Sequence, residues 1–297
     1  MKKYTKLENK QRTTPFLVVA SGIILLYCLS LILPLVWVIF SCFKFNPDFI
    51  KNPFGFPEFG FTLTNFQAIS KIGVQLTSSE GIRIVGVAEM FFYSILYAVG
   101  VSFVANFSRC VCAYIAAKFR HLRWPTFLHV FVVFLMTFSF PSNLAVTIRF
   151  YKMMGMYDNL AMCLITSVAF SGANFLYFYA AFVGVSNEYA EAASLDGAGR
   201  FTIMLRIIMP MIKNIFIALF MLDFIAHWND YNPSLLYLPS YPMLAYGLWR
   251  FQYQKAPSIP VLQQMATTVV VIVPTLTVFI VFKDKIVSNL SIGGLKG

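Results

Sequence analysis

The stretch PFLVVASGIILLYCLSLILPLVWVIFSCF, residues 15–43, carries no charged side chain and indicates the class of fold. A helix needs about 20 apolar residues to cross the hydrocarbon core of a bilayer, whereas the core of a cleavable signal peptide has roughly 7 to 15. The stretch is therefore expected to be a retained transmembrane helix, residues 16–43, preceded by a basic tail, residues 1–15.

The rest of the chain is of the same character. Of its 297 residues, 59% are hydrophobic and only 12% are charged, which leaves too few polar side chains to cover a water-soluble globule. Five further segments are apolar and long enough to span a bilayer: about 90–118, 124–147, 159–186, 214–236 and 261–282. The sequence thus predicts an all-α membrane protein with six transmembrane helices.

The basic residues predict the orientation of these helices. Six spans place both termini on one side, and fourteen Lys and Arg residues fall on that side against eight on the other. By the positive-inside rule both termini are cytoplasmic. Residues 44–89 are then an extracytoplasmic segment, residues 90–282 a five-helix core with a cytoplasmic loop at 187–213, and residues 283–297 a cytoplasmic tail.

The motifs of several enzyme classes are missing from the sequence. It contains no G-x-x-x-x-G-K-[ST] loop for ATP, no H-E-x-x-H pair and no C-x-x-C pair for a metal. We therefore expect no catalytic residue, no metal site and no cofactor in this chain, and a transport role is favoured over an enzymatic one.

One cytoplasmic stretch, EYAEAASLDGAGR at residues 188–200, differs from its apolar surroundings. Its composition predicts two short helices, the first capped by Ser186 or Asn187 and followed by a turn at Asp196 and Gly197. Asp196 is also a candidate cap for the second helix, whose apolar stripe from Phe201 is interrupted at Pro210.

The side chains of this stretch suit close contact with another protein. Small residues let a partner approach the backbone, and carboxylates offer it charged hydrogen-bond acceptors. The candidate contact residues are Glu188, Glu191, Ala192, Ala193, Asp196, Gly197 and Ala198. An exposed helix without a partner is the alternative interpretation.

The segment EAASLDGAGRFTIMLRIIMP, residues 191–210, resembles the E-A-A motif in the membrane subunits of binding-protein-dependent ABC importers. The segments NPFGFPEFGFTLTNFQAI (52–69), HWNDYNPSLLYL (227–238) and IVSNLSIGGLKG (286–297) resemble the sugar-importing branch. Within that branch the chain is similar to the second permease of maltose-type systems.

The resemblance implies a type I ABC importer permease fold and a set of partners. Members work with a second, homologous permease, two ATP-binding subunits and an extracytoplasmic solute-binding protein, in the bacterial cytoplasmic membrane. ATP and magnesium belong to the ATP-binding subunits. The E-A-A segment forms a coupling helix that sits in a cleft of the ATPase, and the resemblance of the tail implies a second contact through Gly293, Gly294 and Lys296.

Polar residues in the predicted fifth span are candidates for the substrate pathway. Asp223 and Asp230 are costly to place in a membrane, and Arg109 is a candidate partner for Asp223. A sugar could be stacked on and hydrogen-bonded by Trp228, Asn229 and Tyr231, although anchoring at the membrane interface explains the two aromatic residues as well. A hydrated helix end is the alternative interpretation for Asp230.

The function predicted from these patterns is the permease subunit of an ATP-driven importer for a sugar or oligosaccharide. It would form half of the translocation pathway and couple to the ATPase through the E-A-A loop. Two alternatives stay open: an ion-gradient-driven secondary transporter, and an ABC permease for a solute other than a sugar.

Overall fold

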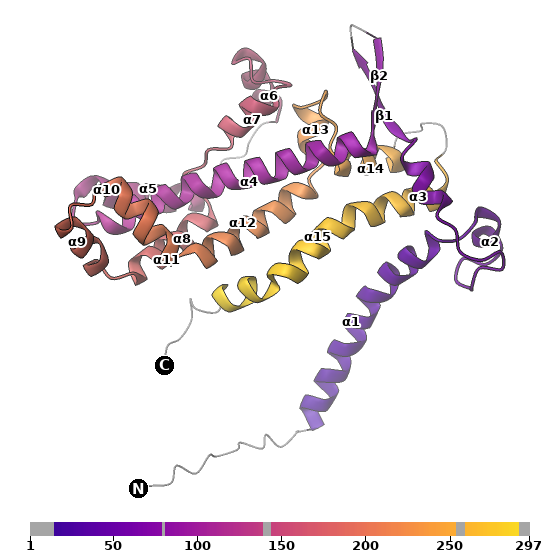
Figure 1. Ribbon diagram of the computed structural model, residues 1–297, viewed down its shortest axis with the longest axis horizontal. Helices are drawn as coiled ribbons and strands as arrows, with labels where there is room; N and C mark the ends of the chain where they lie inside the picture. Colours follow the sequence, from indigo (N-terminus) through magenta and orange to yellow (C-terminus); the bar gives the residue numbers. More distant parts are fainter. Residues whose placement is uncertain (1–14, 79–80, 139–143, 254–258, 291–297) are drawn as a thin grey trace. The chain divides into compact units, whose positions relative to one another are not determined.

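The computed structural model describes residues 15–78, 81–138, 144–253 and 259–290 (Figure 1). The chain forms two compact units, one from residues 1–67 and 260–269 and the other from residues 68–259 and 270–297. Helix α15 (Val261–Leu290) contributes to both units. Each unit is described by itself.

The first unit contains α1 (Pro15–Ser41), α2 (Asn46–Lys51) and most of α3 (Thr64–Ile69). Lys44 is fully buried, and its Nζ donates to the carbonyl oxygens of Pro53 at 2.9 Å and Asn52 at 3.3 Å. This burial lowers the pKa of Lys44, and the nearby Asp48 carboxylate partly opposes the shift. The loop after α1 is thus folded around a buried cation.

The second unit begins with a β-hairpin that the sequence analysis did not anticipate. Strands β1 (Gly73–Ser78) and β2 (Gly81–Gly86) pair antiparallel, with Gly73 opposite Gly86 and Ser78 opposite Gly81. Val74 and Val85 form a buried cross-strand pair. A Cβ at Gly73 would lie 2.6 Å from the carbonyl oxygen of Val85, so only glycine fits there.

Helix α4 (Val87–Lys118) is the central element of this unit, and α8 (Ala173–Gly184) and α12 (Lys213–Trp228) pack along it (Figure 1). Small side chains on α4 let its neighbours approach closely, as in other membrane helix packings. The core around its second half is formed by Cys110, Ala113, Tyr114, Ala117, Phe175, Phe178, Phe182, Ile208 and Leu219.

The prediction of six uninterrupted spans is not confirmed. In the described part of the chain, three helices are long and apolar enough to cross a membrane: α1, α4 and Val261–Lys283 of α15. A bent pair, Arg200–Met211 with Lys213–Trp228, raises the number to four if it is one span. The predicted first and second spans coincide with α1 and α4.

The predicted third and fourth spans are broken into shorter helices. The third corresponds to α5 (Arg123–Thr137) and the start of α6 (Leu144–Met153), and the fourth to α7 (Leu160–Thr166) and α8. The break between α7 and α8 includes Gly172 at φ +120°, a value incompatible with helix. Apolar composition alone did not reveal this break.

The C-terminal boundaries also differ from the prediction. Within the predicted fifth span, 214–236, helix α12 ends at Trp228. Two separate helices follow, α13 (Asn232–Leu236) and α14 (Leu244–Tyr253). Helix α15 runs to Leu290, so the predicted tail 283–297 begins as helix. Gly293, Gly294 and Lys296 lie outside the described residues.

Candidate functional site

The loop at 187–213 is a compact helical corner at one end of the second unit (Figure 1). It consists of α9 (Glu188–Leu195), α10 (Arg200–Thr202), the π-helical stretch η1 (Ile203–Ile208) and α11 (Met209–Met211). A bend of 77° separates α10–α11 from α12. Proline is a poor fit to a continuing helix, and Pro210 stands just before this bend, where the sequence predicts an interruption.

The turn after α9 is a Schellman cap. Gly197 has φ +81°, its N–H donates to the carbonyl of Ser194 at 3.1 Å, and the N–H of Ala198 donates to the carbonyl of Ala193 at 2.9 Å. The predicted turn at Asp196 and Gly197 is thus confirmed. Asp196 ends α9, and Gly199 stands at the cap position of α10, so the prediction that Asp196 caps the second helix is wrong.

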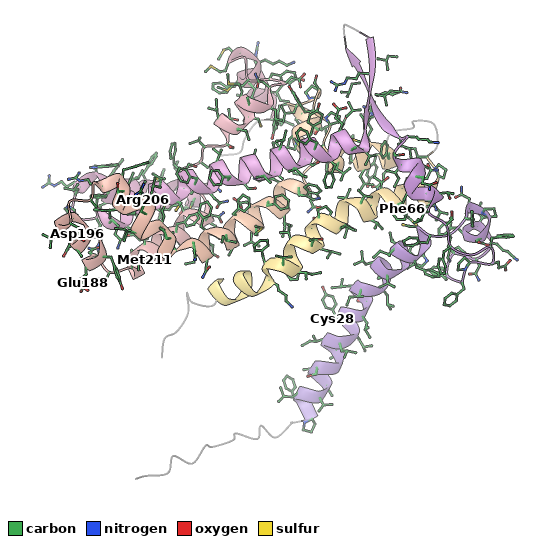
Figure 2. The ribbon with its side chains drawn as sticks, in the orientation of Figure 1. Cys28, Phe66, Glu188, Asp196, Arg206 and Met211 are labelled. Atoms are coloured by element: carbon green, nitrogen blue, oxygen red, sulfur yellow. The ribbon has the colours of Figure 1, made fainter. Side chains whose placement is uncertain are left out.

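The outer face of this corner combines exposed carboxylates with exposed apolar side chains. Glu188, Glu191 and Asp196 are exposed, and Figure 2 shows Glu188 and Asp196 at the outer end of the loop. Leu195 is 90% exposed, and Phe201, the first residue of the predicted apolar stripe, is 69% exposed. Large apolar side chains held in solvent beside fixed charges are typical of a docking surface.

The inner face holds the loop to the helical core. Ala193 is buried in the core cluster beside Ile208. The Nζ of Lys118, at the end of α4, donates to the carbonyl of Val185 and, at 3.0 Å, to Oδ1 of Asn187. The Ser186 hydroxyl accepts from the N–H of Glu188 at 3.2 Å, whereas Asn187, the N-cap residue of α9, makes no side-chain capping bond. The start of α9 is therefore bonded to the C-terminal end of α4.

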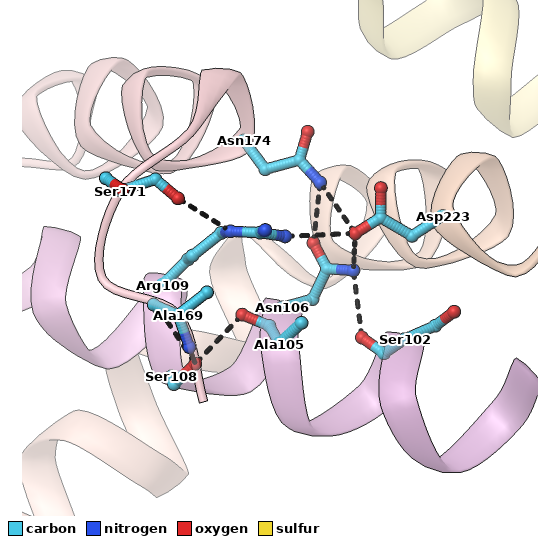
Figure 3. A network of polar contacts seen from close by, with 9 residues as sticks. All are labelled: Ser102, Ala105, Asn106, Ser108, Arg109, Ala169, Ser171, Asn174 and Asp223. Atoms are coloured by element: carbon cyan, nitrogen blue, oxygen red, sulfur yellow. Dashed lines mark hydrogen bonds and ion pairs between the residues drawn. The ribbon is translucent and has the colours of Figure 1, made fainter. Parts of the chain in front are cut away.

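The second candidate region is a polar network between α4, α8 and α12 (Figure 3). Asp223 Oδ2 accepts from Asn106 Nδ2 at 2.8 Å, and from Arg109 Nη1 and Asn174 Nδ2 at 3.1 Å each. The Arg109 and Asp223 side chains are 20% and 24% exposed. The structure thus confirms Arg109 as the partner of Asp223.

The same network satisfies the backbone where the helix between α7 and α8 is broken. Arg109 Nε donates to the carbonyl of Ser171 at 3.0 Å. The Ser108 hydroxyl donates to the carbonyl of Ala169 at 2.9 Å and accepts from its N–H at 3.0 Å. Non-helical backbone at membrane depth requires such internal partners. Sequence reasoning found Arg109 and Asp223 but missed Ser108, whose signal was a polar pair, Ser108-Arg109, inside an apolar run.

The candidate pathway residues near the end of α12 have different environments. Trp228 is 1% exposed, stacks on Phe224, and donates from Nε1 to the carbonyl of Val271 at 3.0 Å. It is therefore a packing residue, and neither sugar stacking nor interfacial anchoring describes it. Asp230 accepts from the N–H and Nδ2 of Asn232 at 3.0 and 2.8 Å and so closes an Asx-turn before α13. Asn229 is exposed and lines an open cavity.

Replacing Trp228 with phenylalanine tests its structural role. The change removes the indole donor and leaves the Val271 carbonyl without it, which we expect to cost about 1–3 kcal/mol of stability. Thermal unfolding of the purified protein would show a lower midpoint, while the half-saturating solute concentration for transport stays that of wild type. A changed half-saturation with an unchanged midpoint would return Trp228 to the substrate pathway.

Long apolar helices with an exposed helical corner are the architecture of a membrane transport subunit. Residues 109–290, more than half of the chain, match the family model described as binding-protein-dependent transport system inner membrane component. The chain belongs to this family of ABC importer permeases. The predicted family is therefore correct, and its class is transport rather than catalysis.

Individual relatives agree with the family assignment. The chain is 24% identical over 283 residues to the diacetylchitobiose uptake system permease protein NgcG of Streptomyces coelicolor, covering 94% of this chain and 88% of that protein. It is 25% identical over 271 residues to the multiple sugar-binding transport system permease protein MsmG of Streptococcus mutans, covering 90% and 92%. The alignments cover most of both chains.

A solved structure shares the fold. A chain in the crystal structure of a bacterial ABC transporter that imports the acidic polysaccharide alginate superimposes with a TM-score of 0.75 at 18% identity, covering 94% of this chain and 99% of that one. The fold is thus that of an ABC importer permease, as predicted. No group of three or more His, Cys, Asp or Glu side chains that could hold a metal occurs among residues 15–78, 81–138, 144–253 and 259–290.

Proposed function

We propose that this chain is the permease subunit for import of a sugar or oligosaccharide, and that its loop at 187–213 docks on an ATP-binding subunit. The observation that carries the docking proposal is the two-faced corner of α9. Exposed Glu191 and Leu195 face outward, whereas Ala193 packs into the core that contains α4 and α12. Movement of a partner bound to the outer face would therefore be transmitted to α4 and α12.

The names of several relatives support a saccharide as the solute. NgcG is named for diacetylchitobiose and MsmG for multiple sugars, and AraQ of Bacillus subtilis, which the chain matches at 29% identity over 117 residues, is named for arabinooligosaccharides. We infer that this chain forms half of a pathway with a second permease in a bacterial cytoplasmic membrane. Both termini are cytoplasmic in this proposal.

The other proposed partners are those that the resemblance to ABC importer permeases implies. The chain carries no P-loop, and in this proposal two ATP-binding subunits hold ATP and magnesium. An extracytoplasmic binding protein delivers the solute. The corner at Gly197 and the tail at Gly293, Gly294 and Lys296 are the proposed contacts with the ATPases.

Reconstitution tests this proposal. The full complex in vesicles should hydrolyse ATP faster when the binding protein delivers a saccharide, and uptake should require ATP. The probes are diacetylchitobiose and an arabinooligosaccharide, with an amino acid and a dipeptide as controls. Stimulation by the amino acid or dipeptide alone would exclude a sugar importer, and uptake by the chain without ATPase under an ion gradient would support a secondary transporter.

A further inference from the structure

We propose that the open cavity beside Trp249, on α14, is a saccharide-binding site of this subunit. The inference rests on the proposed sugar-import function and adds to it a place where this chain itself holds the solute. The cavity has a volume of about 420 Å³. Small-ligand sites commonly have volumes of about 300–1,000 Å³.

Three parts of the second unit supply the walls of the cavity. Helix α14 presents one face, with positions spaced three or four residues apart along the helix. The turn after α12 supplies Asn229 and Tyr231, and α15 supplies Val271. The lining residues are Asn229, Tyr231, Ala245, Leu248, Trp249, Gln252, Tyr253 and Val271.

Three of the eight lining residues are aromatic, and their rings contact one another around Trp249. The rings of Tyr231 and Trp249 are nearly parallel, at 5° with centroids 5.5 Å apart. Tyr253 lies 6.1 Å from Trp249, and the largely buried Tyr246 stacks on Trp249 at 5.8 Å. The Trp249 ring is thereby fixed before any ligand arrives, which reduces the entropy lost on binding.

The polar side chains of the cavity are uncharged: the amides of Asn229 and Gln252 and the hydroxyls of Tyr231 and Tyr253. Gln252 is exposed, and none of the described residues forms a hydrogen bond with its side chain. Asn229 donates from Nδ2 to the carbonyl of Ile225 at 2.8 Å, which orients its amide oxygen as an acceptor. The lining contains no charged side chain.

This combination selects a class of ligand. The C–H face of a pyranose ring is apolar and packs on an aromatic ring, while its hydroxyls need both donors and acceptors at the rim. Amides provide both without charge, so a neutral saccharide fits better than a phosphorylated or acidic one, whose charge would find no partner in the lining. Trp249 replaces Trp228 as the stacking residue.

Tryptophan fluorescence of the full-length chain in nanodiscs gives the first test. We expect millimolar diacetylchitobiose or arabinotriose to change the tryptophan emission of wild type and of the Trp124→Phe control. The emission of Trp249→Phe should not change when the saccharide is added. Trp124 is an exposed residue on α5 and is not part of the cavity. The same change in Trp249→Phe, or no change in wild type, would overturn the proposal.

Uptake by the reconstituted complex gives the second test. Trp249→Ala and Tyr231→Ala should each raise the half-saturating saccharide concentration roughly tenfold, corresponding to loss of one aromatic contact. Capture of the ATPase and of the second permease should be unchanged. Wild-type half-saturation in both variants would overturn the binding site, and loss of the second permease would identify the cavity as a subunit interface instead.

Failure of the proposed function and failure of the binding site alone give different uptake results. If the proposed function is wrong, wild type itself takes up no saccharide with ATP. If only the binding site is wrong, wild type imports saccharide and Trp249→Ala does so equally well.

Discussion

Replacement of Glu191 with lysine is expected to abolish ATPase capture and ATP-dependent uptake while the protein still inserts and folds. Glu191 is exposed in the first turn of α9, so the folded chain loses only a helix-terminus interaction of about 0.3–1 kcal/mol. At an interface, a like-charge contact costs several kcal/mol, and about 3 kcal/mol weakens docking more than a hundredfold. Affinity capture of the ATPase by the purified variant measures this loss.

Gly197 provides a matched pair of variants for the same surface. Proline fixes φ near −65°, and Gly197 has φ +81°, so Gly197→Pro destroys the cap that turns the chain after α9. Asparagine tolerates positive φ, and no atom lies within 4 Å of a Cβ placed there. Gly197→Asn should therefore capture the ATPase nearly as well as wild type. Full capture by both Glu191→Lys and Gly197→Pro would move the docking site away from α9.

The sequence predicted the corner well because its determinants are local. A small-residue helix followed by Asp196 and Gly197 specifies a turn whatever surrounds it, and the Schellman cap at Gly197 bears this out. The first long helix could also be predicted, because its uncharged run needs no partner to be recognised. Both features are encoded within a few turns of chain.

The features that were missed depend on distant residues. The break at Gly172 is stabilised by Ser108 and Arg109, about sixty positions away in the sequence. Apolar composition does not predict a contact between residues so far apart. Trp228 lies within the predicted fifth span, and Trp249 lies in the segment between the fifth and sixth predicted spans. Trp228 is buried because it packs against Phe224 and donates to the carbonyl of Val271, whereas Trp249 lines a cavity. These contacts cannot be read from the residue type.

Truncating Asp223 to alanine is expected to destabilise the helical core by about 3 kcal/mol, because removing one partner of a mostly buried pair leaves the other charge uncompensated. Arg109 would lose its carboxylate, and Asn106 and Asn174 would each lose an acceptor. Asp223→Asn keeps an acceptor oxygen and is the milder control. Unfolding midpoints of the purified variants in one detergent measure the difference.

A double variant decides whether the pair matters for its charges or for the backbone it supports. Arg109 serves both Asp223 and the carbonyl of Ser171, so Arg109→Ala should be at least as harmful as Asp223→Ala. Removing both charges relieves the uncompensated one, and Arg109→Ala/Asp223→Ala should cost less than the sum of the single changes. Strict additivity would mean that the two side chains stabilise the fold independently. Uptake that is lost in Asp223→Asn at an unchanged midpoint would instead point to a charge needed during transport, because the neutral isostere preserves the packing of α4, α8 and α12.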